Sequence, residues 1–266
     1  MRVGLFVPCY VDQMYPDVAV ATVEVLERLG VAVDFPNEQT CCGQPMANTG
    51  IEAAAKPLAE RFVEIFSPYE YVVCPSGSCT AMVRYHYHDF FHDDPAYQGI
   101  KRKTFDLCEF LYDVLRVPSF PFAFPYRVGV HQSCHGLREL RLGWSSETMN
   151  ARDDKVSQLL DRVPGVERVT LQRADECCGF GGTFAVNEAA VSTAMGEDRI
   201  ADHETAGAQV IAAGDMSCLM HLEGLLRRAK KPITVMHVAQ IFAGRNPMLK
   251  SLIQDKISTV ESGARR

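Results

Sequence analysis

The sequence predicts an α/β fold built from two similar halves, and three observations lead to this class. Short β-branched runs alternate with helical stretches along the 266 residues, an order typical of parallel sheets covered by helices. The run Arg-Val-Gly-Leu at 2–5 returns as Arg-Val-Gly-Val at 127–130. The tripeptide Cys-Cys-Gly also occurs twice, at 41–43 and 177–179. We therefore expect two pseudo-symmetric, Rossmann-like lobes with parallel sheets, one for each Cys-Cys-Gly repeat.

The first lobe is expected to cover residues 1–118. Its predicted strands are 3–7, 31–35 and 71–74, and its predicted helices are 16–29, 51–66, 80–87 and 105–115. Pro16 suits the first turn of a helix, and Gly30 is placed to end that helix. The strands are short and apolar, as expected for strands buried on both faces.

Three prolines between Val117 and Pro125 exclude a helix there, so residues 119–126 are predicted to link the lobes. The second lobe is expected to cover 127–257. Its predicted strands are 127–130, 166–171, 209–212 and 233–235, with helices at 187–205, from Cys218 onward and near Ala239. The polar residues 258–266 are predicted to be a disordered tail.

Composition excludes several classes of function. The net charge of -6, without a basic stripe, argues against a nucleic-acid partner. No run of about 18 apolar residues is present, so no transmembrane segment is predicted. The apolar start of the chain is soon interrupted by Pro8 and fits a strand better than a signal peptide. We expect a cytoplasmic protein.

The ten cysteines indicate metal or redox chemistry, because disulfides are uncommon in a reducing compartment. Four of them lie just past predicted strands, and the carboxyl ends of parallel strands meet at one edge of a sheet. Each lobe is therefore expected to gather one set of four thiols. The first set is Cys9, Cys41, Cys42 and Cys79, and the second set is Cys134, Cys177, Cys178 and Cys218.

The spacing within each set favours an iron–sulfur cluster over zinc. Thiolates are soft ligands for both. Structural zinc sites usually draw on short Cys-x(2–4)-Cys knuckles that converge on one ion, whereas here two cysteines are adjacent and the others are distant in sequence. Adjacent cysteines can bind different irons of one cluster. Zinc stays open as the alternative.

Glycines accompany the second and third cysteine of each set. Gly43 and Gly179 permit unusual backbone angles and close approach to a cofactor. Gly181 and Gly182 could direct backbone N–H groups at cluster sulfurs, which would affect the reduction potential. The alternative interpretation is a glycine-rich turn without a ligand.

Some further residues could assist. His131 and His135 flank Cys134 and are candidate hydrogen-bond donors to a cofactor, or ligands. Cys74, in an apolar strand, is either an extra ligand or a core thiol. His221 is treated as an ordinary helix residue whose ligation stays open. No arrangement of acid and base side chains can be assembled, so no catalytic residue is predicted.

The duplicated pattern resembles the cysteine-rich CCG family, which includes the B-type subunit of heterodisulfide reductase and the iron–sulfur subunits of glycolate and glycerol-3-phosphate oxidation systems. It is most similar to the lactate-utilisation A branch. The stretches that carry the resemblance are Cys41-Cys42-Gly43-Gln44-Pro45, Pro75-Ser76-Gly77-Ser78-Cys79, His131-Gln132-Ser133-Cys134-His135, Cys177-Cys178-Gly179-Phe180-Gly181-Gly182-Thr183-Phe184 and Cys218-Leu219-Met220.

The resemblance implies an electron-transfer subunit that acts with two partner subunits when L-lactate is oxidised to pyruvate. It also implies an iron–sulfur cluster in each lobe, or in one lobe if the other is empty. In heterodisulfide reductase each repeat ends with Cys-x-x-Cys, but here Ser76 and Asp215 stand three residues before Cys79 and Cys218. A four-thiolate [4Fe–4S] cluster per lobe is therefore the simpler expectation.

Two other interpretations stay open. The Cys-Cys pairs could serve a thiol/disulfide reductase of the heterodisulfide type, or the cysteines could bind zinc in an assembly module. The leading hypothesis is an electron carrier within an oxidoreductase complex, and whether this chain is itself catalytic is left open.

Overall fold

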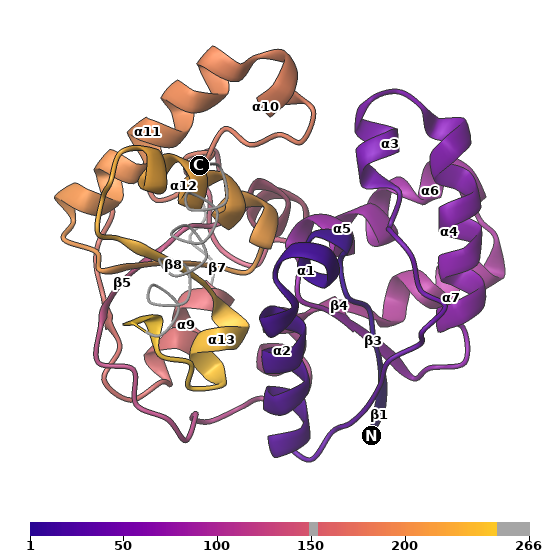
Figure 1. The fold of residues 1–266 in the computed structure, drawn as a ribbon. Helices are drawn as coiled ribbons and strands as arrows, with labels where there is room; N and C mark the ends of the chain where they lie inside the picture. The colour runs from indigo at the N-terminus through magenta and orange to yellow at the C-terminus, as the bar shows by residue number, and fades with distance from the viewer. Residues whose placement is uncertain (149–153, 249–266) are drawn as a thin grey trace, which may run out of the picture.

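The computed structural model describes residues 1–148 and 154–248, in which two α/β lobes lie side by side (Figure 1). Each lobe contains a four-stranded parallel sheet, with strand order β2-β1-β3-β4 in the first and β6-β5-β7-β8 in the second. The first sheet consists of β1 Arg2–Leu5, β2 Ala32–Asp34, β3 Tyr71–Cys74 and β4 Thr104–Asp106. The second consists of β5 Arg127–Val130, β6 Glu167–Arg168, β7 Val210–Ala213 and β8 Thr234–His237. The identical strand order confirms the predicted duplication of an α/β unit.

The first lobe contains most of the short helices. They are α1 Cys9–Met14, α2 Pro16–Arg28, α3 Gln44–Asn48, α4 Glu52–Phe66, α5 Gly77–Ala81, α6 His88–Phe91, α7 Pro95–Lys103 and α8 Leu107–Glu109. Two π-helical turns, η1 Met82–His86 and η2 Phe110–Val114, extend α5 and α8. Helix α2 begins at Pro16 as predicted and buries its apolar side, including Val18 and Val25.

The second lobe repeats this plan, with α11 Ala189–Thr205 and α12 Met216–Arg228 as its long helices. Its other helical segments are the π-helical turn η3 His135–Glu139, then α9 Lys155–Asp161, α10 Phe184–Asn187 and α13 Val238–Phe242. The predicted tail at 258–266 lies outside the described residues.

The helix predicted at 105–115 is wrong at its start. Residues Thr104–Asp106 form β4 and pair with β3, with Cys74 opposite Asp106. The Asp106 side chain then accepts a hydrogen bond from the N–H of Cys108 and caps α8. Pairing with a distant strand, which local sequence does not encode, determines this segment.

One hydrophobic core cluster joins the two lobes. It combines first-lobe residues such as Val25 and Leu26 with second-lobe residues such as Val238 and Phe242. Phe120, from the proline-rich connection, stacks on Phe242 with 4.3 Å between ring centroids. The shared core fixes the lobes against each other.

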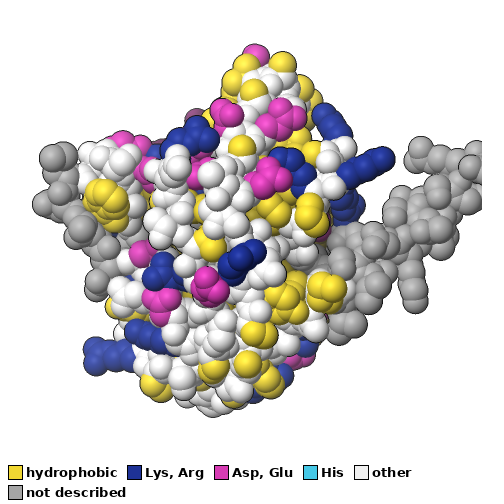
Figure 2. All heavy atoms as spheres, turned by 90° about the vertical axis from the view of Figure 1, so that its left-hand side faces the viewer, with side chains coloured by type: hydrophobic (Ala, Val, Ile, Leu, Met, Phe, Trp, Pro, Cys, Tyr) yellow, Lys and Arg dark blue, Asp and Glu magenta, His cyan; other side chains and the backbone are white. Residues whose placement is uncertain are grey.

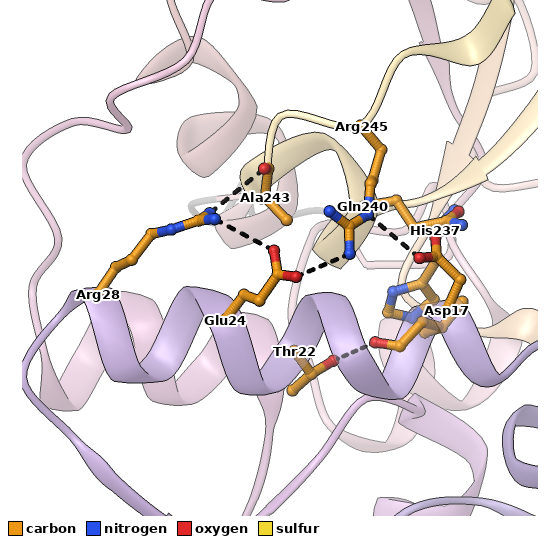
Figure 3. A network of polar contacts seen from close by, with 9 residues as sticks. Asp17, Thr22, Glu24, Arg28, His237, Gln240, Ala243 and Arg245 are labelled. Atoms are coloured by element: carbon orange, nitrogen blue, oxygen red, sulfur yellow. Dashed lines mark hydrogen bonds and ion pairs between the residues drawn. The ribbon is translucent and has the colours of Figure 1, made fainter. Parts of the chain in front are cut away.

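A polar network closes one side of this boundary, between α2 and the end of α13 (Figure 3). Asp17 accepts hydrogen bonds from Gln240 at 2.9 Å and from Arg245 at 3.1 Å. Arg245 also pairs with Glu24 at 3.0 Å, and Arg28 donates to the carbonyl of Ala243 at 3.3 Å. These contacts hold the lobes at a defined angle.

The exterior of the second lobe mixes charges of both signs. Figure 2 shows Lys and Arg side chains interspersed with Asp and Glu side chains on this face. None of the helices within 1–148 and 154–248 has the length and apolar character that a bilayer crossing requires.

Candidate cofactor-binding cleft

The first cysteine set gathers at the carboxyl end of the first sheet, as predicted. Cys9 opens α1 after β1, and Cys79 lies within α5 after β3. Cys41 and Cys42 stand just before α3. The Sγ atoms of Cys9 and Cys41 are 3.7 Å apart, and those of Cys42 and Cys79 are 3.4 Å apart. These distances exceed an S–S bond of about 2.05 Å, and all four thiols are free.

Protons are shared unevenly within the first set. Hydrogen bonds from Cys42 and Cys9 lower the pKa of Cys41 to about 3. The S–H of Cys42, which can donate to either Cys41 or Cys79, and the S–H of Cys74 lower the pKa of Cys79 to about 5. The pKa values of the donors Cys9 and Cys42 are raised by the same bonds. Both shifts favour the thiolate form of Cys41 and Cys79, and thiolates are the form that binds metal.

The second set repeats this arrangement. Cys134 follows β5, and Cys218 lies in the first turn of α12 after β7. Hydrogen bonds from Cys134 and Cys178 lower the pKa of Cys177 to about 2, while the pKa values of both donors are raised. The structure thus brings the four predicted cysteines of each lobe together.

The glycine of each Cys-Cys-Gly tripeptide donates a backbone hydrogen bond to the sulfur of the first cysteine of that tripeptide. The N–H of Gly43 donates to Cys41 Sγ at 3.4 Å, and the N–H of Gly179 donates to Cys177 Sγ at 3.3 Å. Both glycines have positive φ, 86° and 85°, which disfavours a side chain at these positions. Gly181 and Gly182 also have positive φ and line the space between the lobes.

Both cysteine sets open onto one cleft of about 270 Å³ between the lobes. Its first-lobe wall includes Tyr10 and Gln44, and its second-lobe wall includes Phe180 and His135. Tyr10 and Phe180 meet edge to face with centroids 6.1 Å apart, and Gln44 Nε2 lies 3.2 Å from His135 Nε2. The two cysteine sets, which the sequence assigns to separate lobes, therefore share one cleft.

The caps of the two cysteine-bearing helices meet in the wall of this cleft. Ser76 caps α5 and Asp215 caps α12, each three residues before a cysteine of its set. Asp215 accepts hydrogen bonds across the lobe boundary from the N–H of Ser78 at 2.7 Å and from Ser76 Oγ at 3.3 Å. Ser76 and Asp215, which stand where heterodisulfide reductase has the first cysteine of Cys-x-x-Cys, therefore link the two lobes.

The three histidines near the second set differ in their contacts. His131 is 1% exposed, and its ring lies within 4.8 Å of the Sγ atoms of Cys178 and Cys218, a group able to hold a metal ion. Burial lowers the pKa of His131 to about 3, so its ring is neutral at pH 7. His135 turns toward Gln44, and His221 Nε2 donates to the carbonyl of Ser192 at 3.2 Å.

Four other buried residues bear on the cysteine sets, and one of them is Cys74, which the sequence predicts to be either an extra ligand or a core thiol. Cys74 is fully buried, and this burial, together with the hydrogen bond that its S–H donates to Cys79, raises the pKa of Cys74. Cys108 is buried in the core shared by the lobes, as predicted. Sequence reasoning missed Arg199 and His203, both 0% exposed in α11 beside His131. Aligning the two halves residue by residue would have marked His131 as unusual, because Phe6 stands at the same place in the first half.

Comparison with known proteins gives the same pattern. The model of the CCG cysteine-rich domain matches twice, at residues 3–84 and 128–223, which together exceed half of the chain. Lactate utilization protein A of Geobacillus kaustophilus is 41% identical over 250 residues, covering 92% of this chain and 100% of the relative. The proteins of the same name from Bacillus velezensis and Bacillus subtilis are 43% and 41% identical over 249 residues, with the same coverage.

Among solved structures, a substrate-binding protein of a sugar ABC transport system from Bordetella parapertussis aligns with 89% of this chain and 68% of that chain, at 15% identity and a TM-score of 0.29. That similarity is too low to bear on function. The two domain matches, centred on the two cysteine sets, show that this chain belongs to the CCG cysteine-rich domain family.

Proposed function

We propose that this chain is a cytoplasmic iron–sulfur electron-transfer subunit that acts in lactate utilisation together with two partner subunits. The observation that carries the proposal is the pair of equivalent four-thiol sets opening onto one cleft. The names of relatives at about 40% identity over 92% of the chain support the pathway.

The donor chemistry of each set fits a cluster. Soft thiolates are the usual ligands of [4Fe–4S] centres, and each set already contains at least one thiolate of low pKa, Cys41 or Cys177. Cys9, Cys41, Cys42 and Cys79 would hold one cluster, and Cys134, Cys177, Cys178 and Cys218 the other. When bound, such clusters supply one-electron transfer. The N–H groups of Gly43 and Gly179 would hydrogen-bond to the thiolate sulfurs and adjust the potential.

The cleft is poorly equipped for chemistry on lactate. Among the described residues that line it, Asp215 is the only Asp, Glu, Lys or Arg, and its oxygens already accept hydrogen bonds from Ser76, Ser78 and Ser217. Recognition of a carboxylate usually relies on Arg or Lys. We therefore assign lactate oxidation to a partner subunit and electron transfer to this chain.

Zinc is the second candidate, and a specific distance favours it. Four thiolates around one zinc ion at about 2.3 Å stand about 3.8 Å apart, close to the 3.7 Å between Cys9 and Cys41. A zinc-stapled assembly module would need no redox chemistry. Its cysteines would be expected to be sealed from solvent, whereas Cys9, Cys41, Cys134 and Cys177 are partly exposed.

The test is anaerobic purification of the full chain, followed by absorption and EPR spectra before and after reduction with dithionite. The proposal predicts broad absorption near about 400 nm that bleaches on reduction, with an EPR signal in the reduced state. A colourless, EPR-silent protein would refute it. A metal-free chain whose cysteines oxidise in pairs would instead indicate a thiol/disulfide reductase.

Growth on L-lactate tests the pathway separately. In a strain that lacks this chain, the unaltered protein and Cys108→Ala should restore growth, whereas Cys42→Ser and Cys178→Ser should not. Cys108 is buried in the core away from the cleft, so it is the matched control. Restoration by all four proteins would contradict the proposed role of the cysteine sets in lactate use.

A further inference from the structure

The two halves of the chain correspond residue by residue through the first strand of each lobe. Residues 2–9 and 127–134 have equal length and each ends in the first cysteine of a set. Phe6 and His131 occupy the same place within them. The N–H of Phe6 donates to the carbonyl of Val73 at 2.9 Å, and that of His131 donates to the carbonyl of Ala212 at 2.8 Å. The two acceptors, Val73 in β3 and Ala212 in β7, pair with equivalent residues of β1 and β5. His131 therefore occupies in the second lobe the position that Phe6 occupies in the first.

The side chains that surround this position also differ between the two lobes. Phe6 packs edge to face against Phe62 and Phe66 of α4, with centroids 4.9 and 5.7 Å away. In the second lobe, the corresponding helix α11 carries Arg199 and His203 with the same four-residue spacing.

The glycines at equivalent places in β1 and β5 show that Phe66 of α4 corresponds to His203 of α11. A Cβ at Gly4 would meet Phe66, and a Cβ at Gly129 would meet His203. Three aromatic side chains beneath the first cysteine set thus become His131, Arg199 and His203 beneath the second.

This polar group is buried and under-satisfied. His131, Arg199 and His203 are 1%, 0% and 0% exposed. Within 1–148 and 154–248, neither ring nitrogen of either histidine has a hydrogen-bond partner, and neither do Nε and Nη2 of Arg199. Arg199 is held through Nη1 alone, by Asp202 and the carbonyl of Arg173. Buried donors normally have partners. For Arg199 an acceptor lies nearby, because the charge of Glu176, whose Oε2 is also buried without a partner among the described residues, acts on Arg199. His131 is therefore the member of the group that points to an acceptor outside the polypeptide.

The acceptor can be placed from the geometry. The His131 ring lies within 4.8 Å of the Sγ atoms of Cys178 and Cys218, where a cofactor of the second set would sit. Asp202 balances the charge of Arg199 at 3.1 Å. Of the two histidines in the group, His131 is the one with a ring nitrogen in the cluster formed with the Sγ atoms of Cys178 and Cys218. The four cysteines of the set can fill the four iron corners of a cubane, so His131 is needed as a hydrogen-bond donor and not as a ligand.

We propose that His131 donates an N–H hydrogen bond to a sulfur of the second-lobe cluster and thereby makes that cluster the one with the higher reduction potential. This inference rests on the proposed iron–sulfur function. Hydrogen bonds to cluster sulfurs raise the potential because they stabilise the reduced, more negative state. The first cluster has the apolar ring of Phe6 in that place. With clusters bound, one electron would pass from the first centre, which would be oxidised, to the second, which would be reduced, and no bond would be broken.

The test is a potentiometric titration of the full chain followed by EPR. The unaltered protein should show two midpoint potentials. His131→Phe, which copies the first lobe, should lower the higher midpoint and leave the lower one unchanged, while His131→Asn, which keeps an N–H donor, should restore part of the shift. His221→Asn is the matched control in the same lobe, because its ring already binds the Ser192 carbonyl, and it should move neither midpoint.

Pulsed EPR on unaltered protein labelled with ¹⁵N-histidine tests the contact without relying on a variant. A weak nitrogen coupling should appear in the higher-potential signal and vanish in His131→Phe. Unchanged midpoints in an iron-replete His131→Phe protein would overturn the inference, as would a strong coupling typical of direct ligation or a coupling in the lower-potential signal. Absence of iron from the unaltered protein would instead refute the proposed function, so the two failures are distinguishable.

Discussion

The carboxylate of Asp215 accepts a 2.7 Å hydrogen bond from the backbone N–H of Ser78, across the boundary between the lobes. Asp215 is 2% exposed and also caps α12 through Ser217. Since Cys79 and Cys218 lie in the two helices that meet here, this carboxylate sets the position of one cysteine in each set. It is a polar link between the lobes in the wall of the cleft.

Replacing Asp215 by Ala should lower the free energy of unfolding by about 3 kcal/mol, because a helix cap is lost and buried N–H groups are left without an acceptor. Asp215→Asn keeps an acceptor oxygen and should cost less. Urea unfolding measures both. Asp94→Ala removes a cap from α7, away from the boundary, and should cost about 1 kcal/mol. Equal losses for Asp215→Ala and Asp94→Ala would contradict a linking role.

The two Cys-Cys-Gly glycines should differ in their tolerance of alanine. Both have positive φ, which costs a side chain about 1–2 kcal/mol. A Cβ on Gly179 would also lie 2.6 Å from the carbonyl oxygen of Ser192, whereas a Cβ on Gly43 would be 3.3 Å from its nearest neighbour in Ala55. Gly179→Ala should therefore lose roughly 1–3 kcal/mol more than Gly43→Ala, since α11 must move. Thermal and urea unfolding of both variants check this, and equal losses would show that the contact with Ser192 relaxes freely.

His203 should make the protein less stable in mild acid. Burial lowers its pKa in the folded state to about 2, against about 6.5 in the unfolded chain. Below pH 6.5 the unfolded chain therefore binds a proton that the folded protein does not. Stability should fall by about 1.4 kcal/mol per pH unit as the pH is lowered from there, or about 2 kcal/mol by pH 5, from this residue alone. His203→Phe, which introduces the residue found at the equivalent position Phe66, should reduce the loss of stability between pH 6.5 and pH 5. Urea unfolding at these two pH values measures it.

His86 provides a control of opposite sign. A hydrogen bond to Glu139 raises its pKa, so its contribution to stability is fully present below the unfolded value and is lost as the pH rises through the folded value. His86→Gln should steepen the loss of stability in acid where His203→Phe flattens it. A slope in His203→Phe equal to that of the unaltered protein, with His86→Gln still steeper, would mean that His203 is accessible to protons in the folded protein.

The sequence was sufficient for the architecture and for the cysteine sets. Alternating runs with a repeated first strand predicted two parallel-sheet lobes. The rule that ligands gather at the carboxyl ends of strands predicted that each lobe gathers its cysteines at one end, where Cys9 now contacts Cys41, and Cys134 contacts Cys177. These features follow from local patterns and from one general rule of topology.

The sequence was insufficient where contacts between distant segments decide the outcome. Thr104–Asp106 is a strand only because β3 offers it a pairing edge. The shared cleft depends on how the lobes pack, and a sequence pattern does not specify that angle. Arg199 and His203 looked like ordinary polar positions of a helix, and their burial beside His131 became visible only in three dimensions.

The most direct test of the central claim is the iron and zinc content of anaerobically purified chain, measured for the unaltered protein, Cys42→Ser and Cys178→Ser. With one [4Fe–4S] cluster in each lobe, the unaltered protein should contain about eight irons and each variant about four. Stoichiometric zinc without iron, or full iron content in either variant, would contradict the assignment of one iron–sulfur cluster to each cysteine set.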